Sequence, residues 1–132
     1  MSDYYILDKD HNVIGCDLMQ WSEQFYQSRR SDIWRVALDS VAACDVSTVF
    51  LGLDSGYSFL HKGAPLRVFE TMLFSEGDCE VMHRYATWSE AEEGHRTLVD
   101  SLRVLEAESV EMTRAMLSIV RGGLQHHMKA KK

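Results

Sequence analysis

Apolar and polar positions of this chain follow two spacings, one typical of strands and one typical of helices. The strand-like runs are rich in β-branched and aromatic residues and are bounded by turn-forming residues. They lie at 4–7, 13–14, 33–41, 46–53, 66–74 and 81–85. The first two are expected to form a hairpin. The run at 46–53 is apolar on both faces, which predicts an inner strand of the sheet.

A helix is expected from Asp17 to about Ser31. Asp17 and Gln20 have the spacing of a capping box, in which side chain and backbone of the two residues bond reciprocally. The apolar residues of this segment recur at helical spacing, as Leu18, Trp21 and Phe25. In the run at 33–41, Trp34, Val36 and Leu38 are expected on one face of a strand.

A second and longer helix is expected at the C-terminal end. Thr87 and Glu90 have capping spacing, and the chain from 95 to 121 contains neither glycine nor proline. We therefore expect the helix to end only at Gly122-Gly123. Gly94 lies inside it, where glycine costs about 1 kcal/mol relative to alanine. This indicates that another part of the protein packs close to the backbone there.

These elements predict an α+β fold, with an antiparallel sheet of four to six strands, one N-terminal helix and one long C-terminal helix. A chain of 132 residues is one domain by size. We divide it into an α+β globular domain at 1–105, an extension of the last helix at 106–121, and a flexible basic tail at 122–132.

The last helix is too long for its domain. Residues 88–121 would span about 50 Å, whereas a domain of this size has a radius of gyration near 13 Å. Its apolar positions follow heptad spacing with one polar slot, as Leu98, Leu102, Leu105, Ser109, Met112, Met116 and Ile119.

Four explanations of this pattern remain open. The helix pairs with a second copy, docks on another protein, breaks near 106–109 and folds back, or simply covers its own sheet. We expect the last explanation to hold for 98–105. Beyond that, we favour a homodimer, with the interface formed by Leu105, Met112, Met116 and Ile119.

Composition narrows the function classes. The net charge of −6 disfavours general nucleic-acid binding, because phosphate backbones repel a negative protein. Cys16, Cys44 and Cys79 form no CxxC pair, which argues for a reducing compartment. No apolar run reaches 18 residues, so no membrane span is expected. The N-terminus lacks the features of a signal peptide. We expect a cytoplasmic protein.

Candidate chemistry is sparse. No histidine pattern has metal spacing, and no nucleophile or phosphate-binding motif occurs, so we expect no metal, no cofactor and no enzymatic activity. Glu70, His83, Arg84 and His95 are the exceptions, because they would surround a ligand pocket on the sheet if the last helix packs there. The simpler interpretation is an ion pair between Glu70 and Arg84 and a structural hydrogen bond of His95.

The longest irregular stretch begins at Asp54 and ends at Pro65. Long loops often carry function. We expect partner-binding residues there, at Asp54, Tyr57, His61 and Lys62.

Three segments carry a resemblance. VSTVFLGLD at 46–54, VFETMLF at 68–74 and RYATWSEAEEGH at 84–95 resemble a pattern of small uncharacterised proteins encoded by bacteriophages and prophages. The similarity covers roughly residues 4–100. Members of that group typically have a histidine after LGLD and a Pro-Pro step, where this chain has Ser55-Gly56 and a single Pro65.

The resemblance implies a phage-encoded accessory protein that binds and modulates or inhibits a host protein. Host-takeover and anti-defence factors, such as inhibitors of CRISPR effectors, are of this kind. The leading hypothesis is thus a non-enzymatic homodimer that binds a host or phage protein in the host cytoplasm. The alternatives are a small-ligand protein or enzyme with a pocket around the four residues named above, and a virion component.

Overall fold

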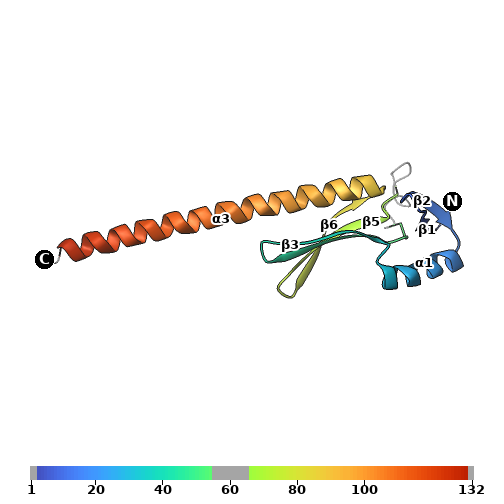
Figure 1. The fold of residues 1–132 in the computed structure, drawn as a ribbon, viewed down its shortest axis with the longest axis horizontal. Helices are drawn as coiled ribbons and strands as arrows, with labels where there is room; N and C mark the ends of the chain where they lie inside the picture. The colour runs from blue at the N-terminus through green and yellow to red at the C-terminus, as the bar shows by residue number, and fades with distance from the viewer. Residues whose placement is uncertain (1–2, 55–65, 131–132) are drawn as a thin grey trace.

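The computed structural model of this protein describes residues 3–54 and 66–130, with side chains described as far as Gly122. Eight elements follow one another along the described chain (Figure 1). They are β1 (Tyr4–Leu7), β2 (Val13–Cys16), α1 (Leu18–Ser31), β3 (Arg35–Val41), β4 (Cys44–Phe50), β5 (Phe69–Ser75), β6 (Asp78–Tyr85) and α3 (Trp88–Ala130). The predicted α+β class is confirmed.

The strands form two antiparallel sheets. β1 and β2 pair as the expected hairpin, and β3-β4-β5-β6 form a four-stranded meander in chain order. β4 is an inner strand, as its apolar pattern predicted, although it covers Cys44–Phe50 rather than 46–53. A bulge between Arg35 and Ala37 reverses the alternation in β3, so Leu38 is exposed while Trp34 is buried. The prediction that these two residues share a face is therefore wrong.

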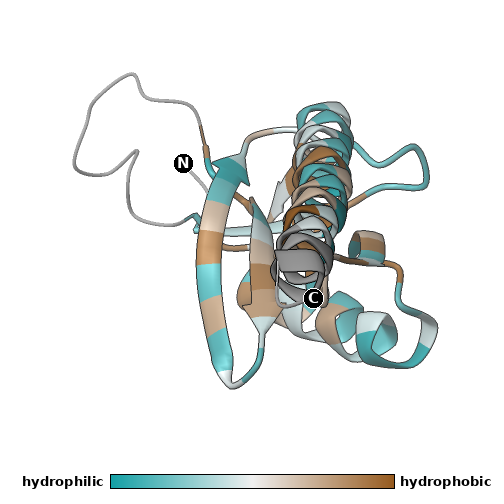
Figure 2. Ribbon diagram, turned by 90° about the vertical axis from the view of Figure 1, so that its left-hand side faces the viewer, coloured by the Kyte–Doolittle hydropathy of each residue, from teal (hydrophilic) through white to brown (hydrophobic). Residues whose placement is uncertain are grey.

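Among the described residues, one helix lies over one face of the larger sheet. The first part of α3 lies across this face, which we call the front face (Figures 1 and 2). Val99 of α3 is buried there in one cluster with Val41 and Val46, and Leu98 and Leu102 pack against it. This confirms that the apolar stripe covers the chain's own sheet as far as Leu102, but not at Leu105, which is exposed.

A second, aromatic core joins α1 and the hairpin to the end of the sheet. Its rings contact one another in a continuous series, with centroid distances of 5.0–5.9 Å, through Trp21, Phe25, Trp34, Phe50 and Phe69. α1 begins as predicted, because Asp17 and Gln20 form the full capping box. In the hairpin turn, the backbone N–H and the amide of Asn12 donate to Asp8, which lowers the pKa of that carboxyl.

α3 is continuous over 43 residues, or about 65 Å. It neither breaks near 106–109 nor ends at Gly122-Gly123, so the expected stop at the two glycines is wrong. The expected tail at 122–132 is also helical as far as Ala130. The physical reason is that glycine disfavours a helix by only about 1 kcal/mol per residue. No proline follows to prevent the helix from continuing.

Gly94 has the packing role that its position indicated. A Cβ atom placed on Gly94 would overlap the ring of Tyr85, so α3 approaches β6 closely at this point. The hydroxyl of Thr87 accepts a hydrogen bond from the backbone N–H of Glu90 at 3.2 Å, which fixes the start of the helix just before this contact.

We expect Gly94→Ala to destabilise the protein by about 1–3 kcal/mol, because the added methyl group overpacks the contact with Tyr85. Gly122→Ala, on the same helix, is the matched control. Apart from the neighbouring backbone of the helix itself, no described atom lies within 4 Å of the added methyl group. The free energy of unfolding in urea measures both. Equal stability of the two variants would contradict a close contact at Gly94.

Candidate functional site

Glu70 and Arg84 form an ion pair on the face of the sheet away from α3. The two residues are cross-strand partners on β5 and β6, and Arg84 Nε donates to Glu70 Oε2 at 3.1 Å. The next residue of β5, Thr71, lies on the front face, because side chains alternate along a strand. The predicted ion pair between Glu70 and Arg84 is thus confirmed.

His95 lies in the interface between α3 and the front face of the sheet. It is only 3% exposed, and its two ring nitrogens are both occupied. Nε2 lies 2.7 Å from Asp39 Oδ2 on β3, and Nδ1 lies 2.7 Å from Thr48 Oγ1 on β4. One histidine of the helix therefore connects two strands.

The hydrogen bonds continue from Thr48 across the sheet. Its hydroxyl lies 2.5 Å from that of Thr71 on β5, and the Thr71 hydroxyl donates to Tyr85 Oη on β6 at 3.1 Å. We call Asp39, His95, Thr48, Thr71 and Tyr85 the polar chain. It touches all four strands and runs directly under α3.

The first three members of the polar chain have the order of a nucleophilic triad: a carboxylate, a histidine and a hydroxyl. Such a site needs a nucleophile that a substrate can reach. Thr48 and Thr71 are 0% exposed beneath α3, so their hydroxyl groups are closed to a substrate. The geometry supports a structural role, in which buried polar groups satisfy one another.

The structure does not bring the four candidate ligand residues together. His83 is on the front face, where its ring lies 4.8 Å from that of Tyr85, and His95 is buried under α3. Glu70 and Arg84 lie on the opposite face. The four side chains therefore form two separate arrangements, and the ligand role suggested for them gains no support from convergence.

The loop prediction is only partly covered by the structure. Asp54 lies in the described chain, where its carboxylate accepts a hydrogen bond from the backbone N–H of Arg67 at 3.3 Å. This bond joins Asp54 to Arg67, the two residues that flank the segment 55–66. Tyr57, His61 and Lys62 lie outside the described residues, and their partner-binding role stays a prediction.

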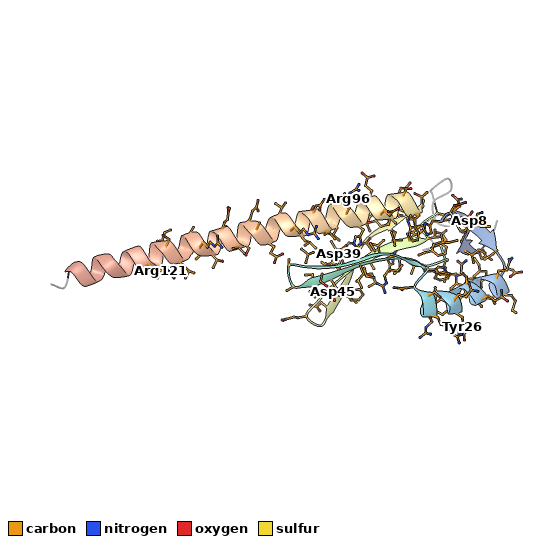
Figure 3. All side chains as sticks on the ribbon, viewed as in Figure 1. Asp8, Tyr26, Asp39, Asp45, Arg96 and Arg121 are labelled. Atoms are coloured by element: carbon orange, nitrogen blue, oxygen red, sulfur yellow. The ribbon has the colours of Figure 1, made fainter. Side chains whose placement is uncertain are left out.

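The most distinctive surface of the protein is the part of α3 that extends beyond the sheet. Arg96 lies over the sheet, whereas Arg121 lies far past its end (Figure 3). The apolar seam predicted from heptad spacing is exposed here: Leu105 is 59%, Met112 66%, Met116 61% and Ile119 73% exposed. A second stripe beside this seam is also exposed, at Val110, Leu117 and Val120.

Sequence reasoning missed a groove between α3 and β6. Its volume is about 370 Å³, and Met82 and His83 of β6 line one wall. Gly94, Leu98 and Ser101 are on the other wall, on α3. These positions precede Leu105 on the same side of the helix, so the groove leads into the exposed seam. The small residues Gly94 and Ser101 were the available sequence signal.

Comparisons of the chain with protein-family models, with curated proteins and with solved structures gave no match. Within the described ranges, 3–54 and 66–130, no helix has the length and apolar character needed to cross a membrane. The same ranges contain no cluster of three or more histidine, cysteine or acidic residues with the geometry of a metal site. The exposed seam and the groove that leads into it are therefore the candidate functional site.

We expect Thr48→Val to destabilise the protein by about 1–3 kcal/mol, because it leaves His95 Nδ1 buried without its partner. Ser118→Ala, which removes a hydroxyl at an exposed position on the polar side of α3, is the control and should change stability by less than about 0.5 kcal/mol. Thermal and urea unfolding measure the difference. If the two variants are equally stable, the polar chain does not hold the helix on the sheet.

Proposed function

We propose that this protein is a phage-encoded accessory protein that binds and modulates a host protein in the host cytoplasm, without catalysis, and that it acts as a homodimer formed through α3. The observation that supports self-association is the exposed apolar seam on a helix that extends past its own sheet. The support for a host target is the resemblance of three segments to phage and prophage proteins.

The energetic argument concerns the seam. Burying one leucine, isoleucine or methionine side chain contributes about 1.5–3 kcal/mol. Leu105, Met112, Met116 and Ile119 are all more than half exposed, and each copy would contribute four such residues to a dimer. The summed contribution of these side chains from both copies exceeds the low end of the free-energy cost of association. Contiguous apolar patches of this kind are typical of interaction sites in soluble proteins.

The proposed host-binding surface is the acidic part of the chain. Residues 1–111 hold all 20 acidic residues but only 9 of the 14 basic ones, so their net charge is −11. Such a surface favours a basic partner and speeds the encounter with it. The segment that begins at Asp54 belongs to this proposed surface.

We expect Met112→Glu combined with Met116→Glu to convert the dimer into a monomer, because both side chains are central in the seam. Sedimentation velocity over a range of concentrations measures the mass. The matched control is Ala107→Glu with Ser118→Glu, which adds the same charge at two exposed positions on the polar side of α3. A wild-type protein that sediments as a monomer at tens of micromolar would refute self-association.

For the host target, we expect one basic protein from a bacterial lysate to be retained on the immobilised wild-type chain, and the pair to form again from purified components. Binding should weaken steeply with salt, since exposed charges are screened at high ionic strength. Calorimetry with the purified pair measures this dependence. Absence of any reconstituted complex, with the dimer intact, would contradict the host-binding part of the proposal alone.

A further inference from the structure

One helix is too narrow for the front face of this sheet. Adjacent strands lie about 4.8 Å apart, so four strands place their outer axes about 14 Å from each other, while a helix with its side chains is about 10 Å wide. α3 reaches β6 closely at its first turns, where Gly94 meets Tyr85. Further along, Met82 of β6 is 41% exposed on the wall of the groove.

The exposed face of α3 is in turn too wide for one partner helix. With about 100° of rotation per residue, Leu105, Met112, Met116 and Ile119 span roughly 60°. The second stripe, at Val110, Leu117 and Val120, widens the apolar face to roughly 180° by the same rotation. A two-helix seam buries only the narrow stripe. The second stripe therefore needs another surface, on one particular side of the seam.

The second stripe lies on the side of α3 that faces the sheet in the first part of the helix. Val99 and Val120 lie 21 residues apart, which is three heptads, so both are on the same side of the seam. Val99 is buried against the sheet. Glu106, one heptad after Val99, accepts a hydrogen bond from the backbone N–H of Ala42 in the turn between β3 and β4. Val120 and the other residues of the second stripe lie on this same side of α3, beyond the end of the sheet.

Symmetry decides which pairing covers the second stripe. In an antiparallel pair, the two-fold axis is perpendicular to the helices and brings the corresponding sides of both to the same side of the pair. The distal part of the partner's second stripe, Leu117 and Val120, then faces this copy's sheet, at β6. In a parallel pair the axis runs along the helices, and the second stripes point away from each other, where no sheet lies.

The distribution of charge along the chain also favours an antiparallel pair. Residues 112–132 hold 5 basic residues and no acidic residue, against the net charge of −11 before them. Exposed carboxylates gather at the end of the sheet where α3 leaves it, as Asp45, Glu76, Asp78, Glu80 and Glu106. An antiparallel pair brings Arg114 and Arg121 of one copy to this end of the other. A parallel pair places the two acidic ends side by side.

We propose that the distal half of α3 from a second copy packs antiparallel in the groove between α3 and β6, so that each sheet is covered by its own helix and by that of its partner. This inference rests on the proposed self-association. Leu105 lies level with Met116 of the other copy, and Ser109 with Met112. In this register Arg121 lies level with Asp100, and Arg114 with the acidic pair Glu106 and Glu108.

Disulfide trapping tests whether the two copies of α3 pair antiparallel or parallel. The background carries Cys16→Ser, Cys44→Ser and Cys79→Ser, and single variants Leu105→Cys and Met116→Cys are made in it. A disulfide requires Cα atoms within about 7 Å. In the antiparallel pair the two copies of residue 105 lie about 16 Å apart along the axis. Mild oxidation should therefore cross-link a mixture of the two variants, and should leave Leu105→Cys alone reduced.

Two results would overturn the inference while leaving self-association in place. One is a cross-linked dimer of Leu105→Cys alone, which indicates a parallel pair. The other is a dimer in sedimentation without a cross-link in the mixture. A wild-type monomer would instead refute the proposed self-association itself, so the two failures are distinguishable.

Met82→Glu tests the groove independently of the cysteines. It should weaken the dimer about tenfold or more, because the partner's second stripe would meet a charge on β6. Leu38→Glu is the matched control, since this exposed residue lies next to Asp39 and on the opposite face of the sheet. It should change the dissociation constant less than about twofold. Equal effects of the two variants would overturn the docking of α3 on β6.

Discussion

The arrangement of this protein depends on how the first turns of α3 are fixed on the sheet. Gly94 allows close approach to Tyr85, and His95 connects Asp39 to Thr48 in the polar chain. Both contacts are directional, because a hydrogen bond needs alignment and the aromatic ring fills a defined space. Together with the hydrogen bond from the Ala42 backbone N–H to Glu106, they set the direction of the helix where it crosses the sheet. The position of the exposed seam relative to the sheet follows from these few residues.

The polar chain also accounts for what first looked like chemistry. A histidine between a carboxylate and a threonine hydroxyl is a familiar catalytic order, but here the hydroxyl continues to a second threonine and then to a tyrosine on the last strand. Each member satisfies the next one in a region that α3 closes. A buried network of this kind makes one position of the helix more stable than neighbouring ones, since a shifted helix leaves several polar groups unpaired.

Most of the elements could be predicted from the sequence, because strand runs, capping pairs and the heptad seam depend on residues close in the chain. The pair Asp17 and Gln20 is one example, and it forms the capping box that its spacing predicted. The failures have non-local causes. A bulge in β3 placed Leu38 on the unexpected face. The polar chain combines residues from four strands and a helix, which no spacing rule connects. The groove is lined by residues of β6 and of α3, which only the packing of the helix on the sheet brings together.

The helix beyond the sheet raises a question of stability that the proposed second copy would answer. In proteins, most of the stability of a helix comes from packing of its apolar face rather than from intrinsic propensity. Here the chain must also pass through Gly122 and Gly123, at a combined cost of about 2 kcal/mol. The polar side of the extension offers little compensation, since its charges are sparse and exposed. Contacts made along the apolar side by a second copy would supply it. Under the proposed self-association, continuity of α3 and dimer formation would be one equilibrium, in which covering the seam stabilises the helix.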